Sequence, residues 1–279
     1  MIPTVHLPDG TAVPALGQGT WYMGETRGQA KAEVTALREG IDLGLTLIDT
    51  AEMYAEGGAE RVVGEAIAGR RERVFLVSKV YPHNASAAGT AKACAASLKR
   101  LGTDRIDLYL LHWRGGHFLS ETVEAFERLR EAGHIRYWGV SNLDTDDMEE
   151  LASVSQAGAC ATDQVLYNPD ERGIEFDLMP WCRKHRMPIM AYSPLGQAGK
   201  LLRSPALASV AQRHGATPAQ IALAWSLRDG ATISIPKAAT LEHVRQNVAA
   251  AALKLTAEDL ATIDAFHKPP GRKQPLAML

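Results

Sequence analysis

The feature that most constrains the fold of this chain is a regular alternation between short apolar runs and stretches with helical spacing. The clearest apolar runs are residues 45–49, 74–79, 106–111, 135–140 and 188–192. Such near-continuous runs are typical of strands that are buried on both faces of a parallel sheet. Helical stretches that end on a glycine, as at Gly44, Gly69, Gly102 and Gly133, separate the runs. About eight strand–helix units therefore follow one another without a linker.

The weaker patterns complete this succession. A turn signal at Pro8-Asp9-Gly10 predicts a small hairpin over residues 6–14, and further strands are expected at 15–20, 160–164 and 232–235. Helices are expected over 28–43, 62–67, 86–101, 123–130, 144–151, 176–185, 217–225 and 240–252, with one more from 256. Pro180 predicts a break or a helix start within 176–185. The tail from 268, rich in proline, glycine and lysine, is expected on the surface.

A (β/α)8 barrel is the commonest single-domain solution for this count of units. We therefore expect residues 1–279 to form one barrel domain with a short N-terminal β-hairpin and one or two extra helices. Its length is acceptable because such barrels routinely reach about 200–250 residues or more. A doubly wound open sheet is the alternative, but no GxGxxG motif follows the first strand.

Composition excludes several classes of partner. The 30 basic and 32 acidic residues give a net charge of −2, so no basic field indicates nucleic acid or an anionic membrane. Neither a membrane-length apolar run nor a signal-peptide pattern is present in the sequence. The three cysteines, Cys94, Cys160 and Cys182, are odd in number and far apart, which indicates small apolar residues in a reducing cytoplasm.

Strand after strand in this chain ends on a polar residue that is able to do chemistry. Each has a structural explanation when taken alone, for example a turn-capping aspartate, a solvated lysine or a packed core histidine. However, the carboxyl ends of all strands in a (β/α)8 barrel meet at one rim, where active sites lie. We therefore expect a site that is built from Asp49, Lys79, His112, Asn142, Gln164, Tyr192 and Lys237.

The chemistry of this set is narrowed by what is missing from the sequence. The sequence contains neither the HxH nor the HExxH spacing that would predict a metal site. It also lacks the GxSxG elbow that would predict a serine hydrolase. Tyr54 near Lys79 is more informative, because an ammonium favours the phenolate and is expected to lower the tyrosine pKa from about 10. Asp49 would keep the lysine charged, and His112 could donate a hydrogen bond to a carbonyl oxygen. Since no side chain delivers hydride, this proton-donating set implies a nicotinamide cofactor.

Three stretches of the sequence resemble the signatures of the aldo-keto reductases. They are Gly44-Leu45-Thr46-Leu47-Ile48-Asp49-Thr50-Ala51-x-x-Tyr54, Gly139-Val140-Ser141-Asn142 and Ile235-Pro236-Lys237. The run Gly17-Gln18-Gly19-Thr20-Trp21-Tyr22-Met23-Gly24 is similar to the bacterial methylglyoxal-reductase-like branch of that family. The resemblance extends from Pro14 to about Phe266. It implies a (β/α)8 barrel that reduces small aldehydes and ketoaldehydes with NADPH.

The resemblance also implies a role for each matching residue. Asp49, Tyr54, Lys79 and His112 would be the catalytic four. Ser141, Asn142 and Gln164 would hold the nicotinamide carboxamide, Tyr192 would stack on its ring, and Lys237 would face the 2′-phosphate. The full cofactor set that it implies is Gly19, Thr20, Trp21, Ser141, Asn142, Gln164, Tyr192, Ser193, Pro194, Leu195, Gly196, Ile235, Pro236, Lys237, Ala238, His243 and Asn247.

The phosphate-binding pattern departs from that of the family at two positions. Ala238 stands where most members have serine or threonine, and His243 stands where they have arginine. Arg245 lies two residues further on, which turns it about 200° away around a helix. We favour NADPH because Lys237 remains, with NADH as the alternative.

The substrate pocket is expected to be open, since the loop 112–120 and the C-terminal tail are short for the family. Its walls would be Trp21, Tyr22, Met53 and Trp113, which suits small aldehydes, ketoaldehydes and keto esters. A second interpretation is a nicotinamide-binding sensor of the same fold with little turnover. A monomer is favoured.

Overall fold

The computed structural model describes residues 1–156 and 158–279, and its central element is an eight-stranded parallel sheet. The strands lie side by side in chain order, from β3 to β10. Bridges from Leu16 to Ser234 and from Gly19 to Lys237 join the last strand to the first, which closes the barrel. The strands are β3 (Gln18–Gly19), β4 (Leu47–Asp49), β5 (Phe75–Val80), β6 (Ile106–Leu111), β7 (Ile135–Ser141), β8 (Cys160–Leu166), β9 (Ile189–Tyr192) and β10 (Thr232–Ser234).

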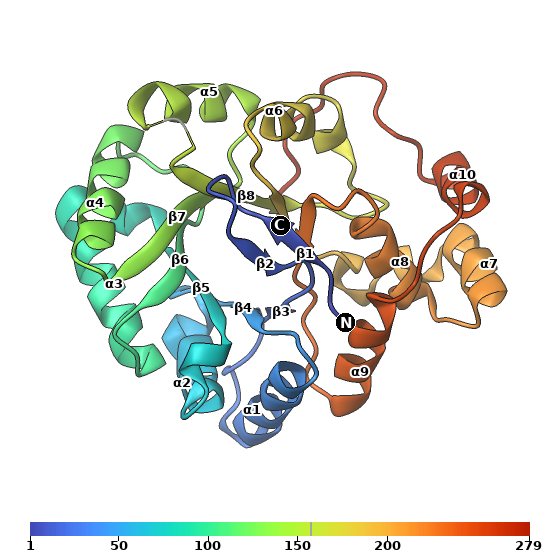
Figure 1. Cartoon of the computed structure of the whole chain (residues 1–279), viewed down its shortest axis with the longest axis horizontal. Coiled ribbons are helices and arrows are strands. Elements are labelled where there is room, and N and C mark those ends of the chain that lie inside the picture. The colour runs from blue at the N-terminus through green and yellow to red at the C-terminus, as the bar shows by residue number, and fades with distance from the viewer. Residues whose placement is uncertain (157) are drawn as a thin grey trace.

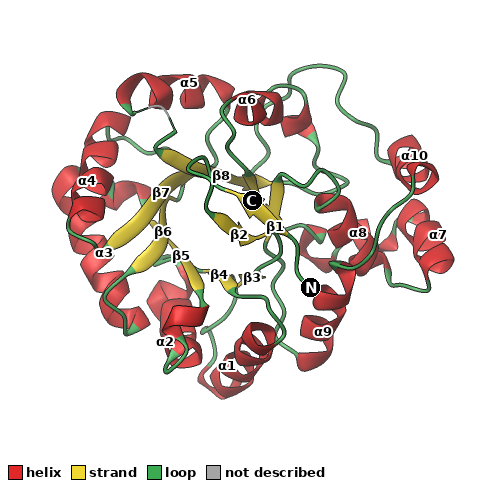
Figure 2. Ribbon diagram, in the orientation of Figure 1, coloured by secondary structure: helices red, strands yellow, loops and turns green. Residues whose placement is uncertain are grey.

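The described residues form ten α-helices, most of which surround the barrel as an outer ring (Figures 1 and 2). The predicted (β/α)8 fold is therefore confirmed. The helices are α1 (Arg27–Asp42), α2 (Gly58–Ile67), α3 (Ala87–Leu101), α4 (Leu119–Glu131), α5 (Thr145–Val154), α6 (Leu178–Lys184), α7 (Pro205–His214), α8 (Pro218–Ser226), α9 (Leu241–Ala250) and α10 (Ala257–Phe266). No helix of the described chain is long and apolar enough to cross a membrane.

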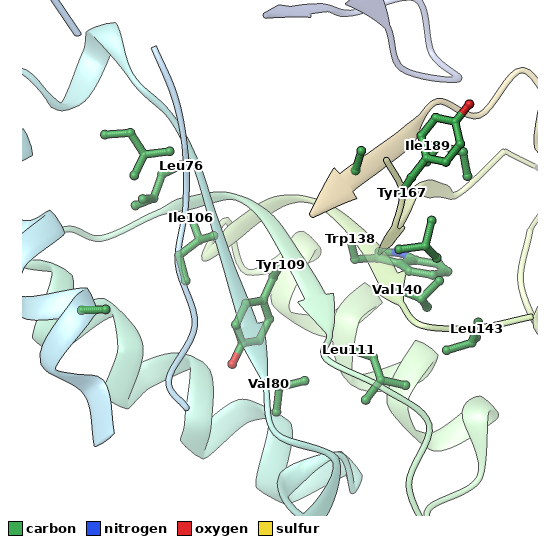
Figure 3. Close-up of a cluster of buried hydrophobic side chains, with 14 of the residues drawn as sticks. Leu76, Val80, Ile106, Tyr109, Leu111, Trp138, Val140, Leu143, Tyr167 and Ile189 are labelled. Carbon is green, nitrogen blue, oxygen red and sulfur yellow. The ribbon is translucent and has the colours of Figure 1, made fainter. Parts of the chain in front are cut away.

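Alternation along the strands divides the interior into two layers. Successive strand residues point to opposite faces, so Val77 packs inside the barrel while Leu76 and Val80 pack outward against the helices. The outer layer contains large aromatic side chains, including Tyr109 and Trp138 (Figure 3). The same alternation places Lys79 on the same face of β5 as Val77, so that its ammonium points into the barrel at the carboxyl end of the strand.

A two-stranded hairpin closes the opposite end of the barrel. β1 (Thr4–His6) pairs antiparallel with β2 (Ala12–Pro14), as the turn signal predicts. Val5 and Val13 join the apolar cluster inside the barrel, together with Leu47 at the start of β4. The hairpin therefore covers the amino ends of the strands and leaves the carboxyl ends for the site.

Barrel closure also explains one glycine of the first strand. A Cβ added to Gly19 would lie 2.6 Å from the carbonyl oxygen of Ile235, which is too close for any larger residue. Gly19 donates its amide to the Pro236 carbonyl oxygen at 3.0 Å, so glycine permits the close approach of the first and last strand segments.

One helix was not predicted from the sequence. α7 begins at Pro205 and is capped by Ser204, which accepts a hydrogen bond from the Leu207 amide. Its signals are present, since Ser-Pro at the start and Gly215 at the end are typical helix boundaries. α7 and α10 are the extra helices beyond the eight-fold repeat. Pro180 lies inside α6, two residues after its start, in agreement with a helix start near that proline.

Candidate active site

The carboxyl ends of the barrel strands surround a cavity of about 380 Å³. Ordinary small-molecule sites have volumes of roughly this size. The residues predicted for the site that line it are Gly19, Thr20, Trp21, Tyr22, Asp49, Met53, Tyr54, His112, Trp113, Ser141, Asn142, Gln164, Tyr192, Ser193, Pro194, Leu195, Ile235, Pro236 and Lys237. Six of the seven residues expected from the strand-end rule line the cavity, and the seventh, Lys79, lies beneath it.

A buried ion pair lies at the base of the cavity, with Asp49 in the lining and Lys79 beneath it. Lys79 has an exposed fraction of 0%, and its Nζ donates to Asp49 Oδ2 at 2.8 Å. The same ammonium donates to the Thr50 carbonyl oxygen at 3.0 Å and to the Tyr54 hydroxyl oxygen at 3.1 Å. All three ammonium hydrogens therefore have acceptors. Because the Tyr54 oxygen accepts from the lysine, its own hydrogen is free to point toward a ligand.

Local backbone structure brings Tyr54 back over the strand end. After β4 the Tyr54 amide donates to the Ala51 carbonyl oxygen, which starts a short 3₁₀ turn over Tyr54–Gly57. Ala55 and Glu56 within this turn have φ values of +50° and +52°, a conformation that non-glycine residues rarely adopt. Strain of this kind is concentrated at functional sites. The turn holds the phenol beside Lys79 rather than letting the chain continue directly into α2.

The charges in this cluster do not shift the tyrosine as the sequence predicted. Burial raises the pKa of Tyr54 above its usual value, and the attraction of Lys79 offsets only part of that effect. The expected lowering was wrong because sequence reasoning included the ammonium but not the desolvation of the phenol. Burial acts to lower the pKa of Lys79, but the Asp49 carboxylate outweighs it and the net shift is upward. At neutral pH, therefore, the lysine is charged and the phenol is protonated.

His112 is a neutral imidazole at the edge of the same cavity. Burial, with a smaller contribution from Lys79, lowers the pKa of His112 to about 2. Its ring meets the Tyr54 ring edge-on, with the centroids 5.6 Å apart. Nδ1 is buried and has no hydrogen-bond partner in the described structure. A neutral histidine carries one N–H, so it can donate a single hydrogen bond toward a ligand oxygen.

An amide and hydroxyl cluster forms the next part of the wall. Ser141 Oγ donates to the Gln164 carbonyl oxygen at 2.8 Å, and Asn142 Nδ2 donates to the His112 carbonyl oxygen at 3.2 Å. Gln164 Nε2 donates to Asp49 Oδ1 at 2.8 Å, which ties the cluster to the ion pair. Tyr192 donates its hydroxyl to Asn142 Oδ1 at 3.0 Å. The three polar residues predicted to hold a carboxamide therefore lie together, next to the tyrosine predicted to stack.

Aromatic side chains form the mouth of the cavity. Trp21 and Tyr22 stack with their centroids 4.5 Å apart, and Trp113 contacts the His112 ring at 4.8 Å. Tyr81 packs edge-on against Trp113, with the centroids 5.2 Å apart, and was not predicted. The four pocket residues predicted from the sequence, Trp21, Tyr22, Met53 and Trp113, all line the cavity.

Some predicted residues do not line this cavity. Lys79 lies beneath its floor, and Gly196, Ala238, His243 and Asn247 are absent from its wall. His243 and Asn247 lie on α9, His243 exposed and Asn247 buried, beyond the exposed Lys237. Arg245 donates to Glu39 at 2.9 Å, so it is engaged with α1.

The sequence missed four residues that line the cavity, namely Gln197, Ala198, Met278 and Leu279. The tail is largely exposed, as predicted, but its last two residues reach the barrel rim (Figure 1). A weak signal for this return was the apolar ending of an otherwise polar tail.

The fold and site together define a class of protein. The described residues contain no group of three or more histidine, cysteine, aspartate or glutamate side chains arranged to hold a metal ion. The rim of this closed barrel presents a tyrosine that is hydrogen-bonded to a lysine, a neutral imidazole and an amide cluster. This arrangement is typical of a carbonyl-reducing barrel enzyme.

Comparison with known proteins identifies the family. Residues 15–268 match the model of the aldo/keto reductase family, and the chain belongs to that family. It is 54% identical over 272 residues to methylglyoxal reductase YeaE of Escherichia coli strain K12, covering 96% of each protein. It is 33% identical to the glyoxal reductase of Bacillus subtilis strain 168, covering 95% of this chain and 93% of that protein. A Klebsiella pneumoniae aldo/keto reductase, solved in complex with NADP and acetate, is 54% identical with a TM-score of 0.97 over the full length of both chains.

Proposed function

We propose that this protein reduces small aldehydes and ketoaldehydes of the methylglyoxal type to alcohols with NADPH, as one barrel domain over residues 1–279. The observation that carries the proposal is the contact of one buried ammonium, Lys79, with both the Asp49 carboxylate and the Tyr54 hydroxyl. Methylglyoxal and glyoxal reductases among its relatives support the substrate class.

The polar side chains around the cavity fit a nicotinamide dinucleotide. Ser141, Asn142 and Gln164 offer hydroxyl and amide groups to a carboxamide, and Tyr192 offers a flat face beside them. At the other side of the cavity, Lys237 has no ion-pair partner within the described residues, so its ammonium is free for a phosphate. A bound nicotinamide would supply hydride from its C4 position. Gly19, Thr20, Trp21, Ser193, Pro194, Leu195, Gly196, Ile235, Pro236, Ala238, His243 and Asn247 complete the proposed cofactor site.

The proton in this reaction comes from Tyr54. Its hydroxyl hydrogen is not used by Lys79, so it is available to the carbonyl oxygen of a substrate in the cavity. As the proton leaves, the ammonium at 3.1 Å stabilises the phenolate that forms. Neutral His112 donates a second hydrogen bond to the same oxygen. Because the lysine is anchored by Asp49, no reorganisation of charge is needed at that moment.

The choice between coenzymes follows from the groups near Lys237. NADPH binds in a Klebsiella pneumoniae relative that is 54% identical to this chain. Here Ala238 offers no hydroxyl and Arg245 is paired with Glu39, so the Lys237 ammonium and the His243 imidazole are left for a 2′-phosphate. NADPH should therefore be preferred over NADH, by less than an arginine-containing site would achieve.

The substrate is expected to be small. The cavity of about 380 Å³ must hold both the nicotinamide end of the cofactor and the carbonyl compound. Trp21, Tyr22, Met53 and Trp113 provide an apolar wall for a short chain. We also propose that the protein acts in the cytoplasm, which its three unpaired cysteines support, and that it is a monomer.

The experiment is a steady-state comparison of NADPH and NADH with methylglyoxal, glyoxal and a nitrobenzaldehyde. The rate is measured as the loss of coenzyme absorbance. We expect turnover of all three aldehydes and the higher kcat/KM with NADPH. A protein that quenches NADPH fluorescence but oxidises none of it across the panel would instead be a nicotinamide sensor.

A further inference from the structure

A second cavity of about 370 Å³ lies away from the barrel rim and shares no lining residue with the first. It is formed where the start of α7 meets the end of α10 and the segment after β8. Three side chains from these separate segments line it together, namely Ser204, His267 and Asp170. The carbonyl-reducing site uses none of them.

These three side chains form a hydrogen-bonded chain. His267 Nδ1 lies 2.7 Å from Asp170 Oδ1, and His267 Nε2 lies 2.7 Å from Ser204 Oγ. A carboxylate oxygen only accepts, so Nδ1 carries the hydrogen in the neutral imidazole. Nε2 is then an acceptor, and the Ser204 hydroxyl donates to it. This order of nucleophile, base and acid activates a serine in hydrolases of unrelated folds, and it is recognised by geometry rather than by sequence.

Neighbouring residues hold the hydrogen-bonded side chains of Ser204 and His267 in place. Ser204 and His267 are 4% and 6% exposed. Arg172 Nη1 donates to the His267 carbonyl oxygen, and the His267 amide donates to Ile263. Ser204 also caps α7, but its bond from the Leu207 amide is long at 3.5 Å. Capping needs a serine oxygen as acceptor only, so it accounts for neither the histidine nor the aspartate.

The charge around the cavity indicates what it binds. Lys200, Arg203 and Lys268 line it, and none of them forms an ion pair with any described residue. Asp170, the single acidic residue among those lining the cavity, is engaged with His267. The amino terminus of α7, a helix of ten residues, adds a further positive potential. A ligand with negative charge is therefore favoured, and Phe266 offers an apolar surface for the remainder.

We propose that this second cavity is an esterase site for small esters whose acyl part carries a negative charge. Ser204 Oγ attacks the ester carbonyl carbon while its proton passes to His267 Nε2. The ester C–O bond then breaks, and His267 returns the proton to the departing alcohol. Water hydrolyses the acyl-serine by the same route, which releases the carboxylic acid and restores the serine. Asp170 orients the imidazole and stabilises its charged form, and the lining cations offset the negative charge on the oxygen.

This site was not predicted from the sequence. The sequence contains no GxSxG elbow, so it did not indicate a serine hydrolase. Asp170, Ser204 and His267 are separated by 34 and 63 positions, so no local motif contains them together. Here the serine lies at a helix start in an α7 segment that sequence reasoning did not detect.

The test is hydrolysis of mono-4-nitrophenyl glutarate by the full-length protein, with neutral 4-nitrophenyl butyrate for comparison. We expect faster turnover of the anionic ester and at least about a 10²-fold loss in Ser204→Asn. Asparagine is as good a helix cap as serine, so α7 should be preserved. Ser86→Asn, at the cap of α3, is the matched control and should retain full ester hydrolysis.

Two further measurements distinguish this site from the first. A fluorophosphonate probe should modify Ser204 in the wild-type chain, as seen by peptide mass spectrometry, without the need for any variant. Tyr54→Phe should keep ester hydrolysis, and Ser204→Asn should keep carbonyl reduction. Equal hydrolysis by wild type and Ser204→Asn, or a probe adduct that is absent from Ser204, would overturn the proposal.

Discussion

Removing the ammonium beneath the site should affect stability and catalysis in different ways. Lys79 and Asp49 are 0% and 3% exposed, with Nζ and Oδ2 2.8 Å apart. At that distance two unit charges attract by about 6 kcal/mol at an effective dielectric constant of about 20. Lys79→Met leaves the Asp49 carboxylate buried with one remaining side-chain donor, Gln164. Loss of one partner from such a buried pair costs about 3–5 kcal/mol of unfolding free energy.

The double variant Lys79→Met/Asp49→Asn removes both charges. Its unfolding free energy should recover most of the loss, because neither buried charge then lacks a partner. Carbonyl reduction should remain impaired in the single and double variants alike, since the phenolate proposed to form on Tyr54 would have no cation beside it.

The assay is urea unfolding at pH 7 of the wild type, both single variants and the double variant, together with kcat for methylglyoxal. A double-mutant cycle gives the coupling energy between the two residues. Strictly additive losses of stability, or a double variant that regains wild-type turnover, would refute this account of the ion pair.

Three further predictions concern single residues. With the pKa of His112 lowered to about 2, kcat/KM for methylglyoxal should show no ionisation between pH 5 and 8, and a limb near pH 6.5 would contradict this assignment. Asp163 is fully buried, neither of its carboxylate oxygens has a hydrogen-bond partner among the described residues, and burial raises its pKa well above the usual value. Because the pKa is raised in the folded state, the wild type loses stability as the pH rises above about 4. In urea unfolding, Asp163→Asn should therefore raise the unfolding free energy relative to wild type by about 1–3 kcal/mol at pH 8 and by less near pH 4.5. An equal gain at both pH values would count against a neutral buried acid. Lys237→Met should raise KM for NADPH about tenfold or more and leave KM for NADH nearly unchanged, whereas Arg245→Met, the matched control, should change neither.

Much of the fold follows directly from the sequence. Buried parallel strands require continuous apolar runs, so residues 106–111 could be assigned almost to the residue as β6. Glycine stops located four helix ends, for example Gly102 after α3 with φ of +64°. α7 was missed because its surroundings, residues 197–216, contain no strand and do not fit the repeat of the barrel.

The site was predictable because barrel topology converts sequence position into spatial position. Asp49 and Gln164 are 115 residues apart, yet both follow from the strand-end rule and lie 2.8 Å from each other. What sequence alone did not give was the balance of burial against charge. The direction in which the pKa of Tyr54 shifts depends on how deeply the phenol is buried, and this burial is seen only in the folded structure.

Contacts made by loops and tails were also beyond the sequence. Met278 and Leu279 reach the cavity only because the tail runs back to the rim, where Lys273 contacts Asp146 on α5 and Asp177 before α6. No periodicity encodes such a path. The pairing of Arg245 with Glu39 likewise depends on how α9 packs beside α1.

The proposed carbonyl reduction depends on one step, in which the Tyr54 hydroxyl, held by a buried ammonium, donates a proton. The most direct measurement is the turnover of Tyr54→Phe with methylglyoxal, beside its dissociation constant for NADPH. We expect a kcat at least about 10²–10⁴-fold lower, with NADPH affinity nearly unchanged because the aromatic ring is retained. A variant that keeps more than a tenth of wild-type kcat would contradict it.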